Sequence, residues 1–242
     1  MHDKKKSVSK AVKEFSRFAD EYNTYNIIQA KAAKTLVEQL PSSVYTNIVD
    51  IGCGSGEVYK NILQNNISFE QFFALDSSQE MLAIHPASEK LKRVYSDFNL
   101  SNAFDQLTVD DNSIVISSSA LQWSRDLDLT LSRLSKKAPK VCFAIFTSST
   151  FKTLHEVAGI KSPIYSEVEL KETIDKYYNG TYEVCQYNLT FESVRDMFKY
   201  IKRSGVSGGE QKLSYKQMKH LMKVYPLDYL EFEVLFVKAD LL

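Results

Sequence analysis

The sequence predicts an α/β fold with a doubly wound, Rossmann-like sheet whose strands are mostly parallel. Three observations lead to this prediction. Of only 8 glycines in 242 residues, Gly52, Gly54 and Gly56 lie together directly after a β-branched run. Strand-like and helix-like segments alternate from residue 45 to residue 147, which indicates crossover connections between parallel strands. The hydrophobic content of 44% is sufficient for a substantial core.

The amino-terminal part, residues 1–41, is expected to form lid helices. Residues 8–25 place apolar side chains, several of them aromatic, on one helical face. This helix either packs on the domain or covers a binding site, and in the second case Arg17 or Tyr22 faces that site. A second helix over residues 27–39 ends before Pro41.

A strand, a glycine loop and a helix are expected to follow one another from residue 45. Ile48, Val49 and Ile51 are typical of a buried strand, and apolar residues at helical spacing follow Gly56. Because glycine has no Cβ, the loop backbone can approach a ligand closely, and the free N–H groups of the new helix favour an anionic group. The G-x-G-x-G spacing matches neither the common dinucleotide loop nor the phosphate loop.

Two acidic residues accompany this loop. Asp50 lies two residues before the first glycine, and a second strand over residues 71–75 ends at Asp76. Asp76 is twenty residues beyond Gly56, the interval at which an acidic side chain binds ribose hydroxyls in such units. A tight turn with a chance aspartate is the alternative. The combination favours a nucleoside site.

The alternation continues beyond Asp76. Ser77 or Ser78 is expected to cap a helix that contains Met81, and residues 91–95 are expected to form the third strand. Asp97 and Phe98 follow that strand. In one interpretation Asp97 accepts the amino group of an adenine and Phe98 packs on its ring; in the other, Asp97 is a solvated turn residue.

The fourth and fifth strands are expected over residues 112–118 and 140–146, with a helix from Leu127 to Leu134 between them. The first of these strands brings a polar group to the carboxyl edge of the sheet, where ligands bind in open α/β folds. Its members are Ser117, Ser118, Ser119, Gln122 and Trp123. The T-S-S-T segment after the fifth strand is expected to cap a helix that runs through His155.

The carboxyl-terminal part departs from this alternation. Strands are expected over residues 182–189 and 229–237, and two helices over 191–203 and 214–225 lie between them. These helices would roof the site. We therefore divide the chain into four parts: lid helices (1–41), core (42–190), helical insertion (191–225) and final core strand (226–242).

The helical insertion carries a basic stripe on each helix. Eight basic residues oppose two acidic ones between residues 195 and 223, and the basic residues recur at helical spacing. A solvated face and a docking surface for an acidic macromolecule both explain such stripes. The residues are Arg195, Lys199, Lys202, Arg203, Lys212, Lys216, Lys219 and Lys223.

Composition argues against several other classes. Lys plus Arg equals Asp plus Glu at 30 each, so no global basic field recruits nucleic acid. The 3 cysteines and the absence of a secretory segment favour a reducing, cytoplasmic setting. The 4 scattered histidines predict no zinc site, and no apolar run is long enough to span a membrane.

The pattern D-x-G-x-G-x-G, followed by an aspartate at the end of the next strand, resembles the S-adenosylmethionine (AdoMet) site of the class I methyltransferases. The resemblance implies that the loop approaches the methionine part of AdoMet and that the strand-end aspartate holds the ribose. AdoMet is therefore the expected cofactor. The expected cofactor-binding residues are Arg17, Asp50, Gly52, Gly54, Gly56, Asp76, Ser77, Met81, Asp97, Phe98, Ser117 and Ser118.

Over nearly its whole length the chain also resembles the malonyl-acyl carrier protein methyltransferases of biotin synthesis. The similar segments are F-S-R-F-A-D-E-Y (15–22), L-Q-W (121–123), F-T-S-S-T-F-K-T-L-H-E (146–156), residues 189–207 and Y-P-L-D-Y-L-E-F-E-V-L-F (225–236). The resemblance implies a seven-stranded sheet with an antiparallel last strand. Ser118 replaces the family's common Asn, and the Gly-Pro often found near positions 148 and 149 is absent, which leaves the substrate contacts open.

The resemblance further implies transfer of the AdoMet methyl group to the free carboxylate of a malonyl thioester, on carrier protein or coenzyme A. A carboxylate is ionised at neutral pH, so no general base is expected. Tyr22, Gln122 and Trp123 are expected to position the substrate, and Arg203 its carboxylate. The acidic carrier protein becomes the expected partner of the basic stripes. The alternatives are methylation of another small carboxylate or hydroxyl, and a catalytically silent AdoMet-binding protein.

Overall fold

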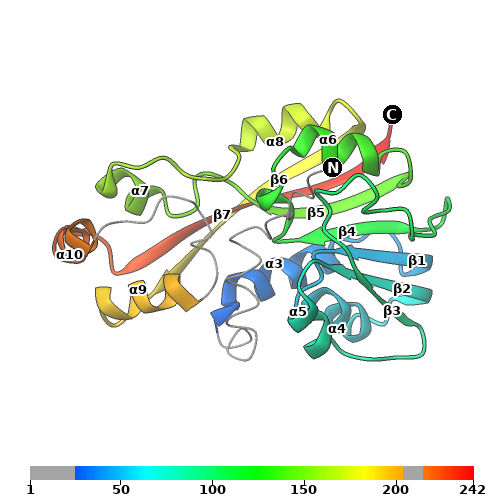
Figure 1. Cartoon of the computed structure of the whole chain (residues 1–242), viewed down its shortest axis with the longest axis horizontal. Helices are drawn as coiled ribbons and strands as arrows, with labels where there is room; N and C mark the ends of the chain where they lie inside the picture. Colours follow the sequence, from blue (N-terminus) through cyan, green and yellow to red (C-terminus); the bar gives the residue numbers. More distant parts are fainter. Residues whose placement is uncertain (1–24, 204–214) are drawn as a thin grey trace, which may run out of the picture.

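The computed structural model describes residues 25–203 and 215–242, and it contains one seven-stranded sheet (Figure 1). The order across the sheet is β3-β2-β1-β4-β5-β7-β6. The strands are β1 (Val44–Ile51), β2 (Ser68–Asp76), β3 (Leu91–Tyr95), β4 (Ile114–Ser118), β5 (Lys140–Phe146), β6 (Tyr178–Thr190) and β7 (Tyr229–Leu241).

The sheet is parallel except at β7. Strand β1 pairs in parallel with β2 on one side and β4 on the other, whereas β7 lies antiparallel between β5 and β6. The predicted mostly parallel, seven-stranded sheet with an antiparallel last strand is confirmed. The chain moves outward from β1 to β3 and then crosses back to β4, so the strand order reverses between β1 and β4. In open α/β folds a ligand crevice forms at this switch point, at the carboxyl ends of the strands.

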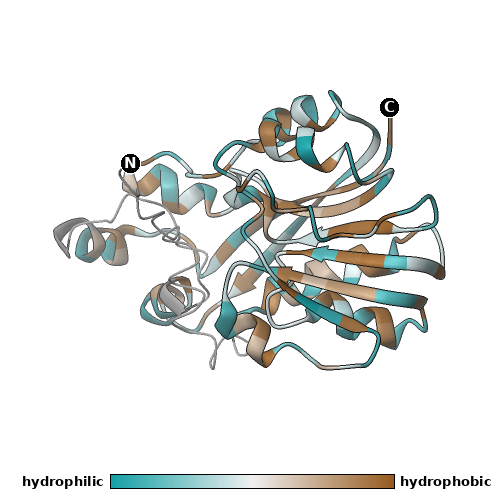
Figure 2. Cartoon of the chain, turned by 45° about the vertical axis from the view of Figure 1, so that its right-hand side comes forward, coloured by the Kyte–Doolittle hydropathy of each residue, from teal (hydrophilic) through white to brown (hydrophobic). Residues whose placement is uncertain are grey.

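Helices cover both faces of the sheet, as a doubly wound fold requires (Figure 1). Alternate strand residues enter two separate cores; Ile48 belongs to one and Val49 to the other. The first core is completed by α3 (Ile27–Glu38), α4 (Glu57–Gln64) and α5 (Gln79–Ile84), and the second by α6 (Leu127–Leu134) and α8 (Glu167–Ile174). Hydrophobic residues accordingly concentrate on the strands (Figure 2).

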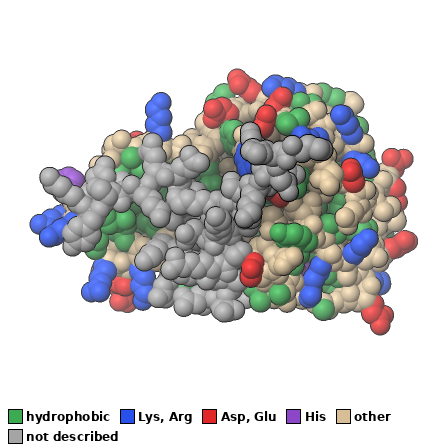
Figure 3. Space-filling view, viewed as in Figure 1, with side chains coloured by type: hydrophobic (Ala, Val, Ile, Leu, Met, Phe, Trp, Pro, Cys, Tyr) green, Lys and Arg blue, Asp and Glu red, His purple; other side chains and the backbone are tan. Residues whose placement is uncertain are grey.

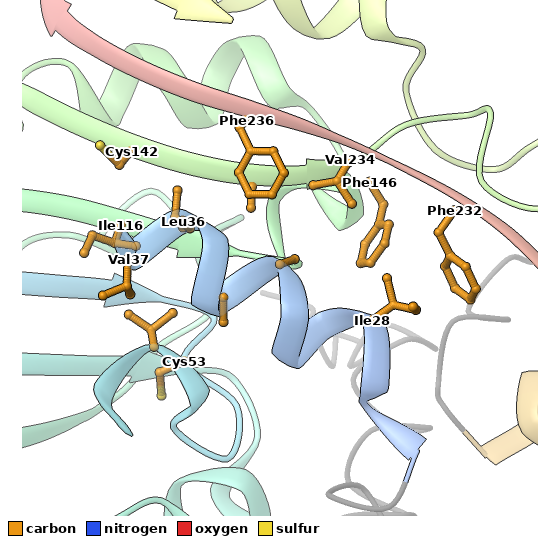
Figure 4. Packing of buried hydrophobic residues seen from close by; sticks show 14 of the residues in the cluster. Ile28, Leu36, Val37, Cys53, Ile116, Cys142, Phe146, Phe232, Val234 and Phe236 are labelled. Atoms are coloured by element: carbon orange, nitrogen blue, oxygen red, sulfur yellow. The ribbon is translucent and has the colours of Figure 1, made fainter. Parts of the chain in front are cut away.

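Helix α3 is the helix predicted over residues 27–39. Its buried residues Ile28, Leu36 and Val37 pack against the sheet, where Phe146 and Phe236 belong to the same cluster (Figure 4). Burial of such side chains contributes roughly 1.5–3 kcal/mol each. Helix α3 therefore has a fixed position beside the carboxyl end of β1. The preceding helix, predicted over residues 8–25, lies almost entirely outside the described residues.

One capping prediction is wrong. Helix α7 (Lys152–Ala158) has Phe151 as its N-cap, in the left-handed region at φ 59°, and no side chain caps it. The hydroxyls of the T-S-S-T segment bond strand β7 instead. Thr147 Oγ1 donates to Glu233 Oε1 at 2.6 Å, and Thr150 Oγ1 donates to the Glu233 carbonyl oxygen at 3.2 Å. The segment therefore fastens the end of β5 to its antiparallel neighbour.

The helical insertion is present between β6 and β7. It contains α9 (Val194–Arg203) and α10 (Tyr215–Val224), and both begin and end close to the predicted limits. Met197 and Tyr200 of α9 and Leu221 of α10 are buried in the first core. Because β7 is antiparallel, the insertion joins it at the carboxyl edge of the parallel strands. The four-part division of the chain stays a prediction, and residues 204–214 lie outside the described part.

Residues 25–203 and 215–242 contain no helix that is long and apolar enough to cross a bilayer.

Candidate functional site

The glycine loop between β1 and α4 has a backbone conformation that residues with a Cβ atom rarely adopt. Gly52, Gly54 and Gly56 have φ values of 72°, 51° and 86°. A Cβ on Gly52 would lie 2.3 Å from the Cβ of Ala120, and one on Gly56 would lie 2.6 Å from Cδ of Pro86. Close packing on both sides therefore requires glycine at these two positions.

Gly54 differs from the other two glycines. No atom of the described residues lies within 4 Å of the place where its Cβ would stand, so this part of the structure leaves the loop open there. Its N–H group donates to Oδ2 of Asp76 at 2.9 Å. The loop is thus supported from one side and open on the other, which is the arrangement that close approach of a ligand to the backbone requires.

Asp76 connects the end of β2 to this loop. Its Oδ1 accepts the N–H group of Ser78 at 2.8 Å, while the preceding Leu75 carbonyl accepts the N–H groups of Gly52 and Cys53 at 2.8 and 3.0 Å. Burial raises the pKa of the Asp76 carboxyl, and backbone hydrogen bonds from Ser78 and Gly54 oppose this rise. The carboxyl is therefore held in one orientation.

Asp50 contributes a buried carboxyl group to the site. Its side chain is buried, with 1% exposure, and neither carboxyl oxygen has a hydrogen-bond partner within the described part of the chain. Desolvation, followed by the negative charge of Asp76, raises the pKa of Asp50 well above its ordinary value. A buried acceptor without a partner costs about 1–3 kcal/mol, so this arrangement is explained best by a ligand that supplies donors.

A hollow lies beside the loop, at the switch point between β1 and β4, where ligands bind in open α/β folds. The hydroxyls of Ser55, Ser118 and Ser119 also lack partners among the described residues. The described lining consists of Gln29, Ala33, Asp50, Gly52, Cys53, Gly54, Ser55, Glu57, Val58, Ser118 and Ser119.

Four of the other predicted cofactor residues have structural surroundings of their own. Ser117 Oγ donates to the Ile51 carbonyl at 2.8 Å and ties β4 to β1. Met81 is buried in α5, and Phe98 is buried in the second core. Asp97 accepts the backbone N–H of Asn99 at 2.9 Å in a turn and lies 3.8 Å from Arg125. Contacts of these residues with AdoMet stay predictions.

Ser78, one of the two serines predicted to cap α5, is its N-cap. The Ser78 hydroxyl accepts the Met81 N–H at 3.1 Å. Ser77, which the sequence analysis assigned to the cofactor, lies between this cap and Asp76 and is partly buried.

Two of the four predicted acceptor residues lie on one short turn after β4. Gln122 and Trp123 belong to the 3-10 helix η1 (Leu121–Trp123), which follows β4. Gln122 Nε2 donates to the Ser119 carbonyl at 2.6 Å, whereas Gln122 Oε1 and Trp123 Nε1 have no partner in the described ranges. Arg203 ends α9. Its side chain, and the predicted site residues Arg17 and Tyr22, lie outside the described residues.

Gln29, Ser55, Glu57 and Ser119 line the hollow and are not among the cofactor residues predicted from the sequence. Gln29 and Ala33 are one helical turn apart on α3, and this spacing was visible in the sequence, but nothing local indicated that α3 faces the glycine loop. Ser119 has φ 62° directly after β4, a strain that only the structure reveals. No group of three or more described His, Cys, Asp or Glu side chains is arranged to hold a metal ion.

Comparison with known proteins agrees with this geometry. Residues 49–138, which contain the glycine loop, β2, β3 and β4, match the family described as "Methyltransferase domain". In the structure of Haemonchus contortus phosphoethanolamine N-methyltransferase 2 in complex with S-adenosyl-L-methionine, a similar fold covers 98% of this chain and 61% of that one, with a TM-score of 0.57 and 17% identity. The predicted class I methyltransferase fold is therefore confirmed.

Curated relatives are similar over most of the chain. The malonyl-[acyl-carrier protein] O-methyltransferase of Bacillus cytotoxicus is 26% identical, with 90% of this chain and 84% of that protein covered. The protein of the same name from Acetivibrio thermocellus is 28% identical, with 87% and 83% covered. The similarity thus extends well beyond the cofactor loop.

Proposed function

We propose that this chain, which has the class I methyltransferase fold and AdoMet as its cofactor, methylates the free carboxylate of a malonyl thioester in biotin synthesis. The observation that carries this proposal is the similarity to malonyl-[acyl-carrier protein] O-methyltransferases across about nine tenths of the chain. A match of this extent cannot be confined to residues 49–138, so it includes parts of the chain outside the methyltransferase domain.

The proposed reaction needs no general base. Gln122 and Trp123, the predicted acceptor residues that the structure describes, could not act as one. Bound AdoMet supplies an electrophilic methyl group on a sulfonium. One bond forms between that methyl and a carboxylate oxygen, and the bond from methyl to sulfur breaks, which leaves a neutral ester and S-adenosylhomocysteine. With a pKa near ~4 the malonyl carboxyl is already ionised, so no proton has to be removed. Alignment and exclusion of water are then the main requirements.

The described residues offer this alignment from two directions. The glycine loop and Asp76 are fixed to each other by the bond from Gly54 N–H, so they present one rigid surface for the nucleoside. Gln122 Oε1 and Trp123 Nε1 lack described partners, which leaves them able to bind an acceptor under the proposal. Under the proposal, Trp123 Nε1 donates a hydrogen bond to the acceptor, and Arg203 holds its carboxylate without protonating it.

The insertion is the proposed docking surface for an acidic acyl carrier protein. Arg195 and Lys199 of α9 and Lys219 and Lys223 of α10 are exposed. Lys and Arg side chains are seen at the end of the molecule that these helices form (Figure 3). Charge complementarity of this kind mainly increases the association rate and depends on salt.

The proposal is tested by incubating the protein with AdoMet and malonyl-acyl carrier protein and measuring the mass of the carrier. We expect the addition of one methyl group, which hydrolysis of the thioester should release from the carrier as part of a monomethyl malonate. Acetyl-acyl carrier protein, which lacks the free carboxylate, is the control and should stay unchanged. Methylation of another small acid or of a hydroxyl, with none on malonyl, would reject the proposed acceptor. Binding of AdoMet with no transfer to any acceptor would indicate a silent binding protein.

A further inference from the structure

The hollow beside the glycine loop combines acceptor atoms with negative charge. Asp50 and Glu57 line it, and the carboxyl oxygens of Asp50 have no partner in the described residues. None of its described lining residues is Lys, Arg or His. A ligand group in this hollow must therefore bring both hydrogen-bond donors and positive charge.

Gln29 adds a further acceptor from a different element. Its side chain is 6% exposed, it lines the hollow, and its Oε1 atom has no hydrogen-bond partner in the described structure. Helix α3 packs against α4, so Gln29 reaches the loop that begins α4. Ala33, one turn further along α3, also lines the hollow, and its small side chain leaves room there. An amide oxygen is an acceptor only, like the Asp50 carboxylate.

An ammonium group has the required properties. It is compact, carries a positive charge and offers three donors. A carboxylate or phosphate would meet only like charge and competing acceptors, and the neutral amino group of adenine would leave the charge of Asp50 unbalanced. AdoMet carries one ammonium, at the α-carbon of its methionine part.

We propose that Gln29 is a further AdoMet-binding residue, and that its amide oxygen and the Asp50 carboxylate together accept the α-ammonium of the cofactor. This inference concerns the cofactor alone and does not depend on the identity of the acceptor. It assigns α3 a direct contact with AdoMet, in addition to its packing on the sheet. Asp50 supplies the charge, and Gln29 fixes the direction from which the ammonium is held.

The inference is tested by calorimetry without any methyl acceptor, so that the outcome is separate from that of the proposed reaction. Two ligands are compared: AdoMet, and 5′-methylthioadenosine, which keeps the nucleoside but has no amino-acid part. In Gln29→Met we expect affinity for AdoMet to fall about 10-fold or more, because one hydrogen bond to a charged group is lost. Affinity for methylthioadenosine should change less than about 2-fold.

Gln39→Met is the matched control. Gln39 is the C-cap of the same helix, and its amide donates to Glu183 at 2.8 Å, away from the hollow. The Gln39→Met variant should bind both ligands with unchanged affinity. If Gln29→Met weakened both ligands equally, or neither, the proposed contact with the ammonium would be wrong.

A second variant tests the inference even if Gln29→Met does not fold. Gln29→Glu keeps the acceptor oxygen and the size of the side chain and adds a negative charge. It should bind AdoMet at least as tightly as the unchanged protein, relative to methylthioadenosine. A selective loss of AdoMet affinity in Gln29→Glu would show that Gln29 acts through its N–H groups and would overturn the inference.

Discussion

The two sides of the proposed active site are built in different ways. On the cofactor side, backbone N–H groups of the loop from Gly52 to Gly56 donate to the Leu75 carbonyl and to the Asp76 carboxylate, and the loop has no room for a side chain at two positions. On the acceptor side, Gln122 and Trp123 present polar atoms without described partners, and the insertion adds exposed cations. From this difference we propose that backbone geometry holds the cofactor, whereas side chains select the acceptor.

The largest expected effect comes from disrupting the cofactor side. In Gly52→Ala the new Cβ meets Ala120 at 2.3 Å, and the residue must also keep φ 72°. We expect AdoMet affinity, measured by calorimetry, to fall about 100-fold or more, equal to about 2.7 kcal/mol. Gly159→Ala is the control, because Gly159 has φ 64° but the new Cβ would have no atom of residues 25–203 or 215–242 within 4 Å. A similar loss of affinity in both variants would contradict the steric explanation.

Trp123→Ala should distinguish the acceptor side from the cofactor side, because it should lower the rate of methyl transfer without weakening AdoMet binding. Removal of an indole that positions the acceptor should lower kcat/KM for malonyl-acyl carrier protein about 10- to 100-fold. The dissociation constant of AdoMet should stay within about 2-fold, since the glycine loop is unchanged. Steady-state kinetics and calorimetry on the same sample give both values. An unchanged esterification rate would remove Trp123 from the proposed acceptor site, and Arg203→Ala tests the proposed cation in the same way.

Asp50→Asn should stabilise the ligand-free protein and weaken its binding of AdoMet. The pKa of Asp50 is higher in the folded protein than in the unfolded chain, so the folded state binds more protons. This group therefore stabilises the ligand-free fold at low pH, and its contribution is lost as pH rises from the unfolded pKa towards the folded one. Near neutral pH, Asp50→Asn should raise the midpoint of thermal unfolding by a few degrees, equal to about 1 kcal/mol, while AdoMet binding weakens. A lower midpoint in the ligand-free variant would contradict this.

The smallest expected effect concerns carrier docking. Reversal of two exposed charges in Lys219→Glu/Lys223→Glu should raise KM for malonyl-acyl carrier protein about 3- to 10-fold at low salt, with less effect on malonyl-coenzyme A. The pair Lys136→Glu/Lys137→Glu, exposed beyond the end of α6, is the matched control. Equal effects of the two double variants would indicate general electrostatics and not a docking surface.

The sequence predicted the elements whose signals are local. Strands β3 and β5 begin and end at the predicted residues. Strand β5 has the clearer local signal, because it is a short, almost entirely apolar run. Helix α8 was missed, although Ser166 and Glu169 form a capping box, since its residues show little apolar periodicity. Strand β6 begins at Tyr178, before the predicted residue 182, because pairing with β7 extends it through Asn179 and Gly180. That pairing is long-range and has no local signature.

The same distinction holds for the site. Three glycines and two aspartates in one short pattern indicated the cofactor loop directly. The position of Gln29 depends on how α3 crosses the sheet. The lack of described hydrogen-bond partners for the hydroxyls of Ser118 and Ser119 depends on which groups surround them. These features are set by tertiary packing and could not be derived from residues close in sequence.

The antiparallel placement of β7 has a consequence for how proteins of this architecture can diversify. Strands β6 and β7 are both 13 residues long and pair along their full length, so the two ends of the insertion are clamped together. The segment between them can therefore vary where it does not contribute the side chains Met197, Tyr200 and Leu221 to the first core. If the insertion selects the acceptor, as proposed, grafting it between related enzymes should transfer substrate preference while the strands that carry the cofactor loop stay unchanged.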